Sequence, residues 1–219
     1  MRIISLNVSE ITEVKHKGKL VKTAIYKQPT TRRIMLGVLG FEGDDQADKR
    51  HHGGPTQAAY AFSAEEYAYW RTALGRFDLS YGLFGENMTV EGLDDSKVCI
   101  GDIYLVGGAR VQVTFPRLPC STLAMAVADP GIVKGFLKRK RVGPYFAVLG
   151  AGEVGVADEI TLETAQSDRV SIVELMYLLH DAPGSQKDRE RWQAAASIDA
   201  LDVRVKTKLL VKLEGRAKE

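Results

Sequence analysis

The sequence predicts a mainly β (α+β) protein, in which a strand-rich region of residues 1–165 contains one inserted helix and precedes three short helices over residues 166–219. Three observations indicate this class. Residues 110–115 alternate between apolar and polar side chains, which is the period of a half-buried strand. Further strand-like runs are broken by glycine turns, and the C-terminal region shows helical spacing of apolar residues. Many short strands with glycine-rich connections favour a barrel or a sandwich over an alternating α/β sheet.

Three runs carry the strand prediction. Residues 110–115 (RVQVTF) place three apolar side chains on one face and three polar ones on the other. The runs 98–108 (VCIGDIYLVGG) and 145–156 (YFAVLGAGEVGV) are rich in β-branched and aromatic residues and are interrupted by glycine. We therefore expect strands in each run, with turns at the glycines.

One helix is predicted inside the strand-rich region. Ser63 and Glu66 have the spacing of a capping box, in which the two side chains satisfy the free amides of a first helical turn. Gly75 is placed to end the helix, because glycine adopts the left-handed conformation at little cost. The side chains that fall on adjoining turns between these signals are Tyr67, Trp70, Arg71 and Leu74.

Three more helices are predicted after residue 165. Ser171 and Glu174 repeat the capping-box spacing before an apolar run, and residues 186–196 form a second helical segment. Asp199 is the expected cap of a third helix, which ends at Gly215. The apolar residues expected to pack in this small three-helix bundle include Trp192, Leu201, Val205, Leu209, Leu210 and Leu213.

The composition is that of an ordinary globular protein, with 45% hydrophobic and 26% charged residues among 219. The net charge of +2 predicts no surface for nucleic acid or membranes, and the C-terminal segment from Asp168 carries 10 basic and 9 acidic residues. No apolar run reaches the roughly 18 residues of a membrane span, and the N-terminus lacks a signal-peptide pattern. Two cysteines make no disulfide framework, so we expect a cytoplasmic protein with free thiols.

The segment FPRLPC (residues 115–120) places a cysteine in a stiff and cationic setting. Its two prolines restrict the backbone, so the sulfur of Cys120 has a defined direction. A cation such as Arg117 favours the thiolate, which binds soft metals and can carry sulfur as a persulfide. The alternative is a buried cysteine that acts as a small apolar side chain. That alternative suits Cys99, inside a strand-like run, better than Cys120.

A second candidate is the polar stretch GDDQADKRHHGGP. Lys49, Arg50 and His52 offer positive charge to an anion, and Gly53 and Gly54 allow positive φ or the close approach of a ligand. A polar surface turn between strands is an equally good interpretation of this stretch.

The third candidate is FGENMTVEGL (residues 84–93), in which two glycines bracket Glu86 and Asn87. Taken alone it is read as a turn. The basic run 138–141 (KRKR) is read as a solvated loop, with a contact to a cofactor phosphate or a redox partner as the alternative.

Four motifs occur together and in order: GDDQADKRHHGGPTQA, FGENMTVEGL, GDIYLVGGARVQVTFPRLPC and VGPYFAVLGAGEV. In this order and spacing they resemble the MOSC family, named after the C-terminal region of molybdenum cofactor sulfurase. The resemblance covers about residues 1–165, and the C-terminal helices resemble the helical domain of the bacterial YiiM-like subgroup. It implies a MOSC-type β-barrel with a pocket at one mouth over residues 1–165, followed by the three-helix bundle of residues 166–219.

The resemblance also implies a site. In molybdenum-binding members the cysteine of the Pro-Arg-x-Pro-Cys motif coordinates the metal of the pterin cofactor, and Cys120 occupies that position. The residues expected to bind the molybdenum cofactor are Lys49, Arg50, His52, Gly53, Gly54, Asn87, Arg117, Cys120 and Tyr145, and Glu86 is expected to move protons. Pro144 stands where the family often has an aromatic residue, and Thr122 stands where lysine is frequent, so either change could alter how the cofactor is held.

The activity implied is that of a molybdenum-cofactor-dependent oxidoreductase, which reduces N-hydroxylated compounds such as 6-hydroxylaminopurine or amidoximes to amines. The chain has no iron–sulfur cysteine cluster and no G-x-G-x-x-G stretch leading from a strand into a helix. Electrons are therefore expected from a separate flavoprotein or ferredoxin-type carrier. Since every cofactor motif precedes residue 166, residues 1–165 are expected to bind the cofactor without the C-terminal helices. The remaining alternative is a sulfur-transfer protein in which Cys120 carries a persulfide without a metal.

Overall fold

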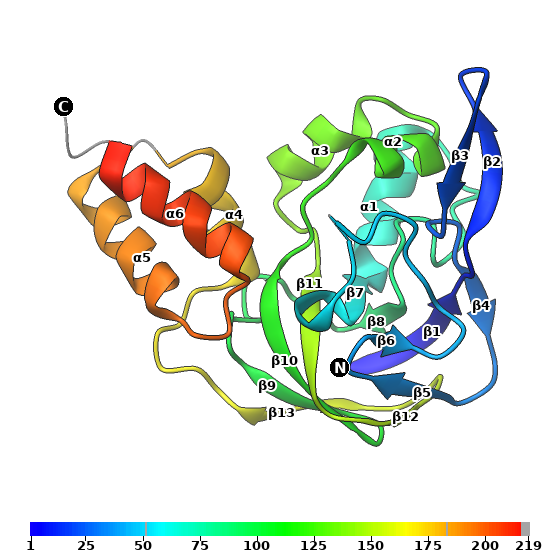
Figure 1. The fold of residues 1–219 in the computed structure, drawn as a ribbon, viewed down its shortest axis with the longest axis horizontal. Coiled ribbons are helices and arrows are strands. Elements are labelled where there is room, and N and C mark those ends of the chain that lie inside the picture. The colour runs from blue at the N-terminus through cyan, green and yellow to red at the C-terminus, as the bar shows by residue number, and fades with distance from the viewer. Residues whose placement is uncertain (51, 183, 216–219) are drawn as a thin grey trace.

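The computed structural model describes residues 1–50, 52–182 and 184–215, and in this part of the chain a curved sheet of eight strands is flanked by helices (Figure 1). The strand order is β13-β9-β10-β11-β7-β8-β1-β4, and neighbours are antiparallel except for β7 and β8. The predicted α+β class is therefore confirmed. The strands are β1 (Arg2–Val8), β4 (Gln28–Thr30), β7 (Ala59–Ser63), β8 (Met88–Glu91), β9 (Ile103–Val106), β10 (Ala109–Pro116), β11 (Pro144–Gly150) and β13 (Ile160–Thr164).

The sheet curls without closing into a barrel, so that β13 and β4 remain its edge strands among the described residues. Its curvature still brings the start of β1 to the segment before β13. The Ile3 amide donates to the Asp158 carbonyl at 3.0 Å, and the Ala157 amide donates to the Ile3 carbonyl at 2.8 Å. These bonds link the start of β1 to the chain before β13. The end of β1 pairs with β4 instead, so the two edges of the sheet do not meet along their full length.

Two smaller sheets accompany the main one. The first has the order β12-β5-β6, and the second is the β2–β3 hairpin, which projects from the body of the protein (Figure 1). The hairpin is exposed along most of its length, because no helix covers either face. These strands are β2 (Thr12–His16), β3 (Lys19–Thr23), β5 (Ile34–Gly37), β6 (Gly40–Phe41) and β12 (Gly152–Val154).

The strand predictions hold with local corrections. In β10, Val111 and Val113 are fully buried as expected, but Thr114 on the supposed polar face is also buried, and its hydroxyl donates to the Thr56 carbonyl at 2.7 Å. Residues 98–101 form a turn rather than a strand, with one bridge from Cys99 to Ser171. Residues 150–155 do have G-x-G-x-x-G spacing, but they connect β11 to β12 and lead into no helix, so no dinucleotide fingerprint is formed.

Helix α1 (Ala64–Leu74) follows Ser63 and ends at Gly75, whose φ of 62° is left-handed, as predicted. The predicted capping box is absent. The Ser63 hydroxyl donates to Glu65, and the Glu66 carboxylate pairs with Arg139 instead. The short elements η1 (Pro55–Gln57), α2 (Ser121–Val127) and α3 (Ile132–Arg139) were not predicted.

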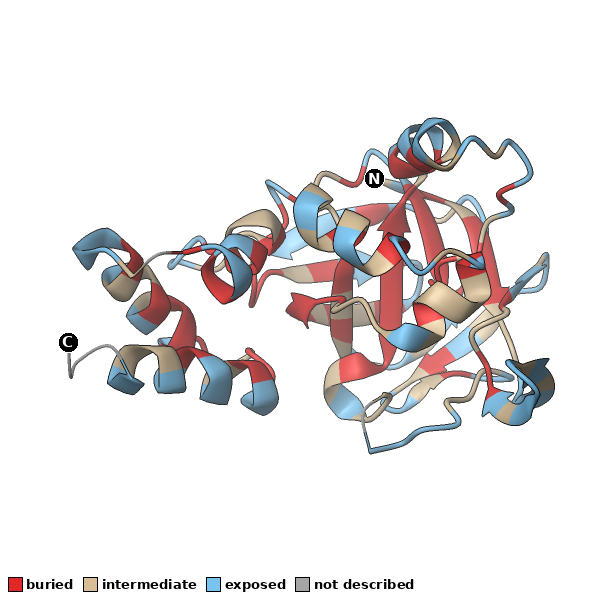
Figure 2. Cartoon of the chain, turned by 90° about the horizontal axis from the view of Figure 1, so that it is seen from above, coloured by how far each residue is buried: buried red, intermediate tan, exposed pale blue. Residues whose placement is uncertain are grey.

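Aromatic side chains hold α1 and α3 against the sheet. The Trp70 ring stacks on Phe136 with centroids 4.8 Å apart, and Phe136 stacks on Phe62 of β7 at 5.8 Å. Phe84 packs against the same three rings. The burial pattern in Figure 2 shows buried residues where the helices face the sheet and exposed residues on their outer faces. The core thus forms a layer between the helices and the concave sheet.

Helices α4 (Ile172–His180), α5 (Gln186–Ser197) and α6 (Val203–Gly215) form a C-terminal bundle. Ser171 caps α4 by accepting from the Glu174 amide, but the Glu174 carboxylate pairs with Arg191 rather than completing a capping box. A full box that the sequence analysis missed, Ser185 with Asp188, starts α5.

Trp192 is buried at the centre of the bundle, and its indole nitrogen donates to the Leu178 carbonyl at 2.9 Å. Two expectations about α6 are wrong. Asp202, not Asp199, bonds the first free amides of this helix, and Leu210 is 44% exposed. Two aspartates lie close together before this helix, and the sequence alone does not show which of them begins it.

The start of the bundle is bonded to the turn that precedes β9. The Ile100 amide donates to the Val170 carbonyl at 2.9 Å, and the Ile172 amide donates to the Val98 carbonyl at 3.0 Å. Asp102 is fully buried and pairs with Arg169 at 2.7 Å. The proposed boundary at residue 166 stays a prediction. Within the described ranges, every helix is too short or too polar to cross a bilayer.

Candidate functional site

Cys120 lies in the wall of an open pocket. The pocket opens between the main sheet, the base of the β2–β3 hairpin and the chain around residues 44–57. Six predicted site residues line it, namely His52, Gly53, Asn87, Arg117, Cys120 and Tyr145. Lys27, Asp44, Gln57 and Tyr60 also line it, and the sequence analysis did not select them.

The sulfur of Cys120 is surrounded by groups that stabilise a thiolate. Cys120 is the N-cap residue of α2, although its side chain makes no capping hydrogen bond, and the His52 and Arg117 side chains lie beside its sulfur. Burial alone would raise the pKa of this thiol. The neighbouring His52 side chain, the Arg117 charge and the polar backbone at the start of α2 outweigh burial, and the pKa of Cys120 falls to about 6. At neutral pH this site therefore presents a partly buried thiolate.

Arg117 is a buried cation of the pocket, with 4% of its surface exposed. Its side chain contacts the Cys120 sulfur, donates to the Leu118 carbonyl at 3.1 Å and lies 5.9 Å from the centre of the Tyr60 ring. Among the described residues, no carboxylate forms an ion pair with it. The charge of this buried guanidinium is therefore balanced by the Cys120 thiolate and by aromatic faces rather than by a carboxylate.

Aromatic rings form the adjoining wall. Tyr145 lies between Tyr60 and Phe115, with ring centres 5.2 Å and 5.1 Å away. The Tyr60 hydroxyl donates to the Val142 carbonyl at 2.8 Å. Burial raises the pKa of both tyrosines, so each stays protonated and neutral at physiological pH. The wall therefore presents neutral aromatic rings to the pocket.

A buried ion pair that the sequence analysis missed lines the pocket. Lys27 contacts Asp44 at 2.5 Å, and the side chains are only 7% and 3% exposed. Asn87 donates its amide hydrogens to Asp44 at 2.9 Å and to the Asn7 carbonyl at 3.3 Å. Its oxygen accepts from the Tyr60 amide at 3.1 Å. Asn87 thus holds the wall together with hydrogen bonds to protein, and its predicted contact with a ligand stays a prediction. Asp44 belongs to the GDD stretch that the sequence analysis selected, whereas nothing in the sequence around Lys27 indicates that it lines a site.

Glu86 is not brought into the pocket. Its carboxyl is fully buried, and one oxygen accepts from Tyr67, Gly82 and Thr89 at 2.5, 2.8 and 2.8 Å. The second oxygen has no partner among the described residues. Burial raises the pKa of Glu86 despite the three donors. A neutral carboxyl in the core fits these contacts, so the geometry gives no support to its predicted role in moving protons.

The remaining predicted residues lie beside the pocket or outside it. Lys49 pairs with Asp45 at 3.2 Å and shares a neighbouring groove with Gly54, whereas Arg50 is exposed. Gly53 and Gly54 have φ of 77° and 86°, which confirms the need for glycine at both positions. Of the two departures from the family pattern, Thr122 lines the pocket and Pro144 is buried in β11 away from it.

The KRKR run is not the solvated loop that the sequence predicted. Arg139 makes two hydrogen bonds to Glu66 at 2.8 and 2.9 Å. Lys140 pairs with Asp181 at 2.6 Å, and Arg141 pairs with Asp94 at 3.0 Å. The run ends α3 and is largely neutralised by acids from other elements, and none of its residues lines the pocket.

The donor set fits a thiophilic metal carried by an anionic cofactor. Cys120 offers one soft thiolate, Arg117 supplies positive charge beside it, and the His52 imidazole lies next to both. No cluster of three or more His, Cys, Asp or Glu side chains with metal-binding geometry occurs in the described parts of the chain. A metal at Cys120 would therefore take its other ligands from a cofactor rather than from the protein.

Comparisons with known proteins identify the family. Residues 48–161 match the model of the MOSC domain. An uncharacterized protein of Bacillus subtilis, YflK, is 38% identical over 170 residues, which are 78% of this chain and 76% of YflK. A Gibberella moniliformis protein named as a reductase is 32% identical over 148 residues, but these are only 26% of its length.

The fold is also shared with a solved structure. The crystal structure of YiiM from Geobacillus stearothermophilus superimposes with a TM-score of 0.81 at 29% identity, covering 97% of this chain and 98% of that one. The match includes the C-terminal helices as well as the sheet, because nearly all of both chains is covered. The chain therefore belongs to the MOSC family, as a YiiM-like member with a C-terminal helical bundle.

Proposed function

We propose that this chain is a molybdenum-cofactor-dependent reductase that converts N-hydroxylated compounds to amines. The observation that carries the proposal is the Cys120 thiolate between His52 and the buried, carboxylate-free Arg117. Membership of the MOSC family, which is associated with the molybdenum cofactor, supports it, and so does the fungal relative named as a reductase.

The balanced reaction is R–NH–OH + 2 e⁻ + 2 H⁺ → R–NH₂ + H₂O. When bound, the cofactor would supply two-electron oxygen-atom chemistry, which no side chain of the protein provides. Cys120 would hold the metal through its sulfur. Arg117 and His52 would stabilise the negative charge at the sulfur and on the cofactor. The Tyr60–Tyr145 wall would exclude water and orient a planar substrate.

A sulfur-transfer protein is the second candidate, because the same low-pKa thiolate can carry a persulfide without a metal. The two functions make different demands on the purified protein. We would express the chain in a host that makes the molybdenum cofactor and quantify molybdenum and pterin. We would then assay 6-hydroxylaminopurine and an amidoxime with reduced viologen dye. Stoichiometric metal with turnover supports the reductase. If the protein instead contains no metal and releases sulfane sulfur on cyanolysis, the reductase proposal is wrong and the sulfur-transfer function takes its place.

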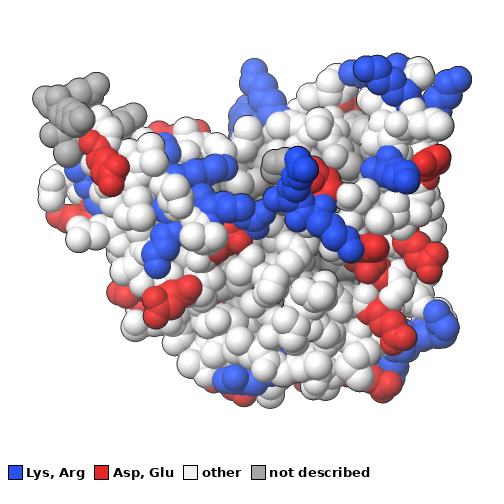
Figure 3. All heavy atoms as spheres, in the orientation of Figure 1, with Lys and Arg blue, Asp and Glu red and all other residues white. Residues whose placement is uncertain are grey.

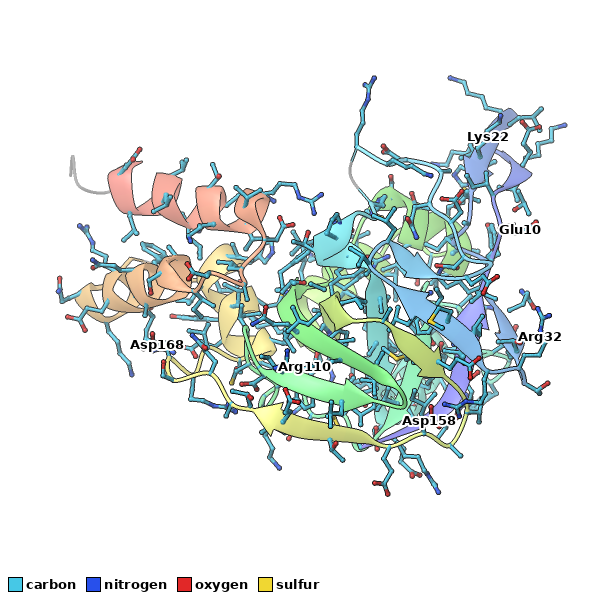
Figure 4. The ribbon with its side chains drawn as sticks, turned by 60° about the horizontal axis from the view of Figure 1, so that its bottom comes forward. Glu10, Lys22, Arg32, Arg110, Asp158 and Asp168 are labelled. Atoms are coloured by element: carbon cyan, nitrogen blue, oxygen red, sulfur yellow. The ribbon has the colours of Figure 1, made fainter. Side chains whose placement is uncertain are left out.

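Electrons would arrive from a separate flavoprotein or ferredoxin-type carrier, and the structure changes where we expect it to dock. The KRKR run is paired with acids and leaves little free charge for a carrier. Lys15, Lys17 and Lys19 are exposed on the β2–β3 hairpin without an ion-pair partner in the described chain, and Lys22 at its base lines the pocket. Figure 3 shows positive charge gathered at this end of the protein, and Figure 4 labels Lys22 there. We expect an acidic carrier to approach over this hairpin.

A further inference from the structure

The chain segment that brings His52 to Cys120 is anchored by the C-terminal bundle. His52, Gly53 and Gln57 line the pocket, and the segment turns through two residues of positive φ, Gly53 and Gly54, before η1. We call residues 52–57 the site loop. The Gly53 amide donates to the Gln57 side chain at 3.3 Å, and the Gln57 amide donates to the Gly54 carbonyl at 2.9 Å. The loop therefore has internal bonds, but it needs external anchors to fix its position.

Thr56 supplies two such anchors in opposite directions. Its carbonyl accepts from the Thr114 hydroxyl of β10 at 2.7 Å, which ties the loop to the sheet. Its hydroxyl donates to the Asp202 carboxylate at 2.6 Å. Asp202 lies at the start of α6, so this second bond reaches across to the C-terminal bundle. Figure 1 shows α6 starting beside the sheet and running away from it.

Asp202 is held in place from both sides. It is 2% exposed, and Arg204 binds it with two parallel hydrogen bonds of 2.9 Å. The Arg204 guanidinium lies 5.7 Å from the ring of Phe115, next to the Tyr145 wall of the pocket. Burial would raise the pKa of Asp202, but the Arg204 and Thr56 hydrogen bonds outweigh burial and lower it. Thr56 therefore donates to an ionised carboxylate with a fixed orientation.

We propose that Asp202 is a positioning residue, which fixes the site loop through Thr56 and so makes the C-terminal bundle part of the cofactor site. The relevance to the cofactor rests on the proposed function, whereas the anchoring of the loop does not. The proposal also revises the expectation that residues 1–165 bind the cofactor alone, because that segment lacks Asp202.

Matched variants separate anchoring from general stability. Thr56→Val removes the hydroxyl and keeps the side-chain shape, while Thr56→Ser keeps the hydroxyl. Asp202→Ser still offers an oxygen to cap α6 but is too short to reach Thr56. Asp188→Ala is the control, because Asp188 caps α5 within the bundle and does not contact the loop.

Hydrogen exchange of the Gly53, Gly54, Thr56 and Gln57 amides in cofactor-free protein is the first measurement, and molybdenum and pterin content of purified protein is the second. We expect Thr56→Val and Asp202→Ser to exchange these amides about tenfold faster or more and to retain several-fold less cofactor. Thr56→Ser should match the natural protein. Asp188→Ala should lower the melting temperature without speeding exchange in the loop.

Two results would overturn the proposal: unchanged loop exchange in Thr56→Val, or equal acceleration in Asp188→Ala. If the natural protein binds no molybdenum, the proposed function fails, and the exchange data still decide whether the bundle anchors the loop.

Discussion

The His52 side chain lies beside the sulfur of Cys120 and helps to lower the pKa of that thiol, although the two residues belong to different motifs far apart in the sequence. The contact forms because the site loop and the start of α2 meet at the same pocket wall. Arg117 contacts the same sulfur from within the Pro-Arg-x-Pro-Cys motif. One thiol thus has two basic side chains as neighbours, only one of which its own motif supplies.

The first prediction concerns the ionisation of Cys120. In cofactor-free protein, alkylation by iodoacetamide should rise with pH through a midpoint of about 6, since the thiolate is the reacting form. His52→Ala should move the midpoint upward, because it removes the strongest stabilising contact. Cys99, which is buried, should stay unlabelled. A midpoint near the ordinary thiol value of about 8.5 would contradict the pocket electrostatics.

The second prediction concerns the metal ligand. Cys120→Ser should lose molybdenum and all N-hydroxyl reduction while it remains folded, because a serine hydroxyl is a poor ligand for a thiophilic metal. Cys99→Ser should keep both, with a stability loss of about 1 kcal/mol from placing a hydroxyl in a buried site. Metal analysis and circular dichroism check the pair. Stoichiometric metal in the Cys120 variant would remove Cys120 from the site.

The third prediction concerns two glycines of positive φ. A Cβ at Gly143 would overlap the carbonyl oxygen of Ala61, whereas a Cβ at Gly75 would meet nothing within 4 Å. Gly75→Ala should therefore cost only the conformational strain of about 1–2 kcal/mol. Gly143→Ala should cost about 3 kcal/mol or more, because the backbone must move. Urea denaturation measures both, and equal losses would show that the close contact at Gly143 relaxes freely.

The fourth prediction concerns Asp95, which is buried and accepts from the Gly143 amide at 2.7 Å. Burial raises the pKa of Asp95 to about 7, against about 3.9 in the unfolded chain. The folded state therefore favours the protonated carboxyl. The stability that this gives is at its maximum below about pH 4 and is lost as the pH rises through about 7.

Asp95→Asn should flatten this dependence by up to about 1.4 kcal/mol per pH unit relative to the natural protein. Urea denaturation at about pH 5 and about pH 8 tests the difference between the two proteins. If the free energy of unfolding changes equally with pH in Asp95→Asn and in the natural protein, Asp95 is ionised over this whole pH range.

The fifth prediction concerns the carrier. Reversing the exposed hairpin charges with Lys15→Glu, Lys17→Glu and Lys19→Glu should slow turnover driven by a reduced acidic flavodoxin about tenfold at low salt, because charge steers transient redox encounters. Turnover driven by viologen dye should not change. The matched control reverses Lys134, Lys138 and Lys208, which are exposed on α3 and α6. Equal slowing by both sets would remove the hairpin as the docking surface.

Local patterns in the sequence determine several elements of the fold. The alternation of residues 110–115 predicts β10, and Gly75 predicts the end of α1. The thiol environment of Cys120 is also predictable in part, because Arg117 and the prolines are its sequence neighbours. These predictions succeed because the relevant physics acts within one strand, one helical turn or one motif. The short helices α2 and α3 escape prediction because seven or eight residues carry too little periodicity.

Only the tertiary structure decided which polar groups meet. His52 reaches Cys120, Lys27 pairs with Asp44, and Asp202 binds Thr56, yet each pair joins elements whose order in the sheet and bundle has no local signature. The same reason explains the KRKR run, whose charges are matched by acids from distant elements. Burial makes such partners necessary, because an unpaired buried charge is costly, but sequence shows only that a partner is needed. The curved sheet, by bringing distant segments together, determines which partner it is.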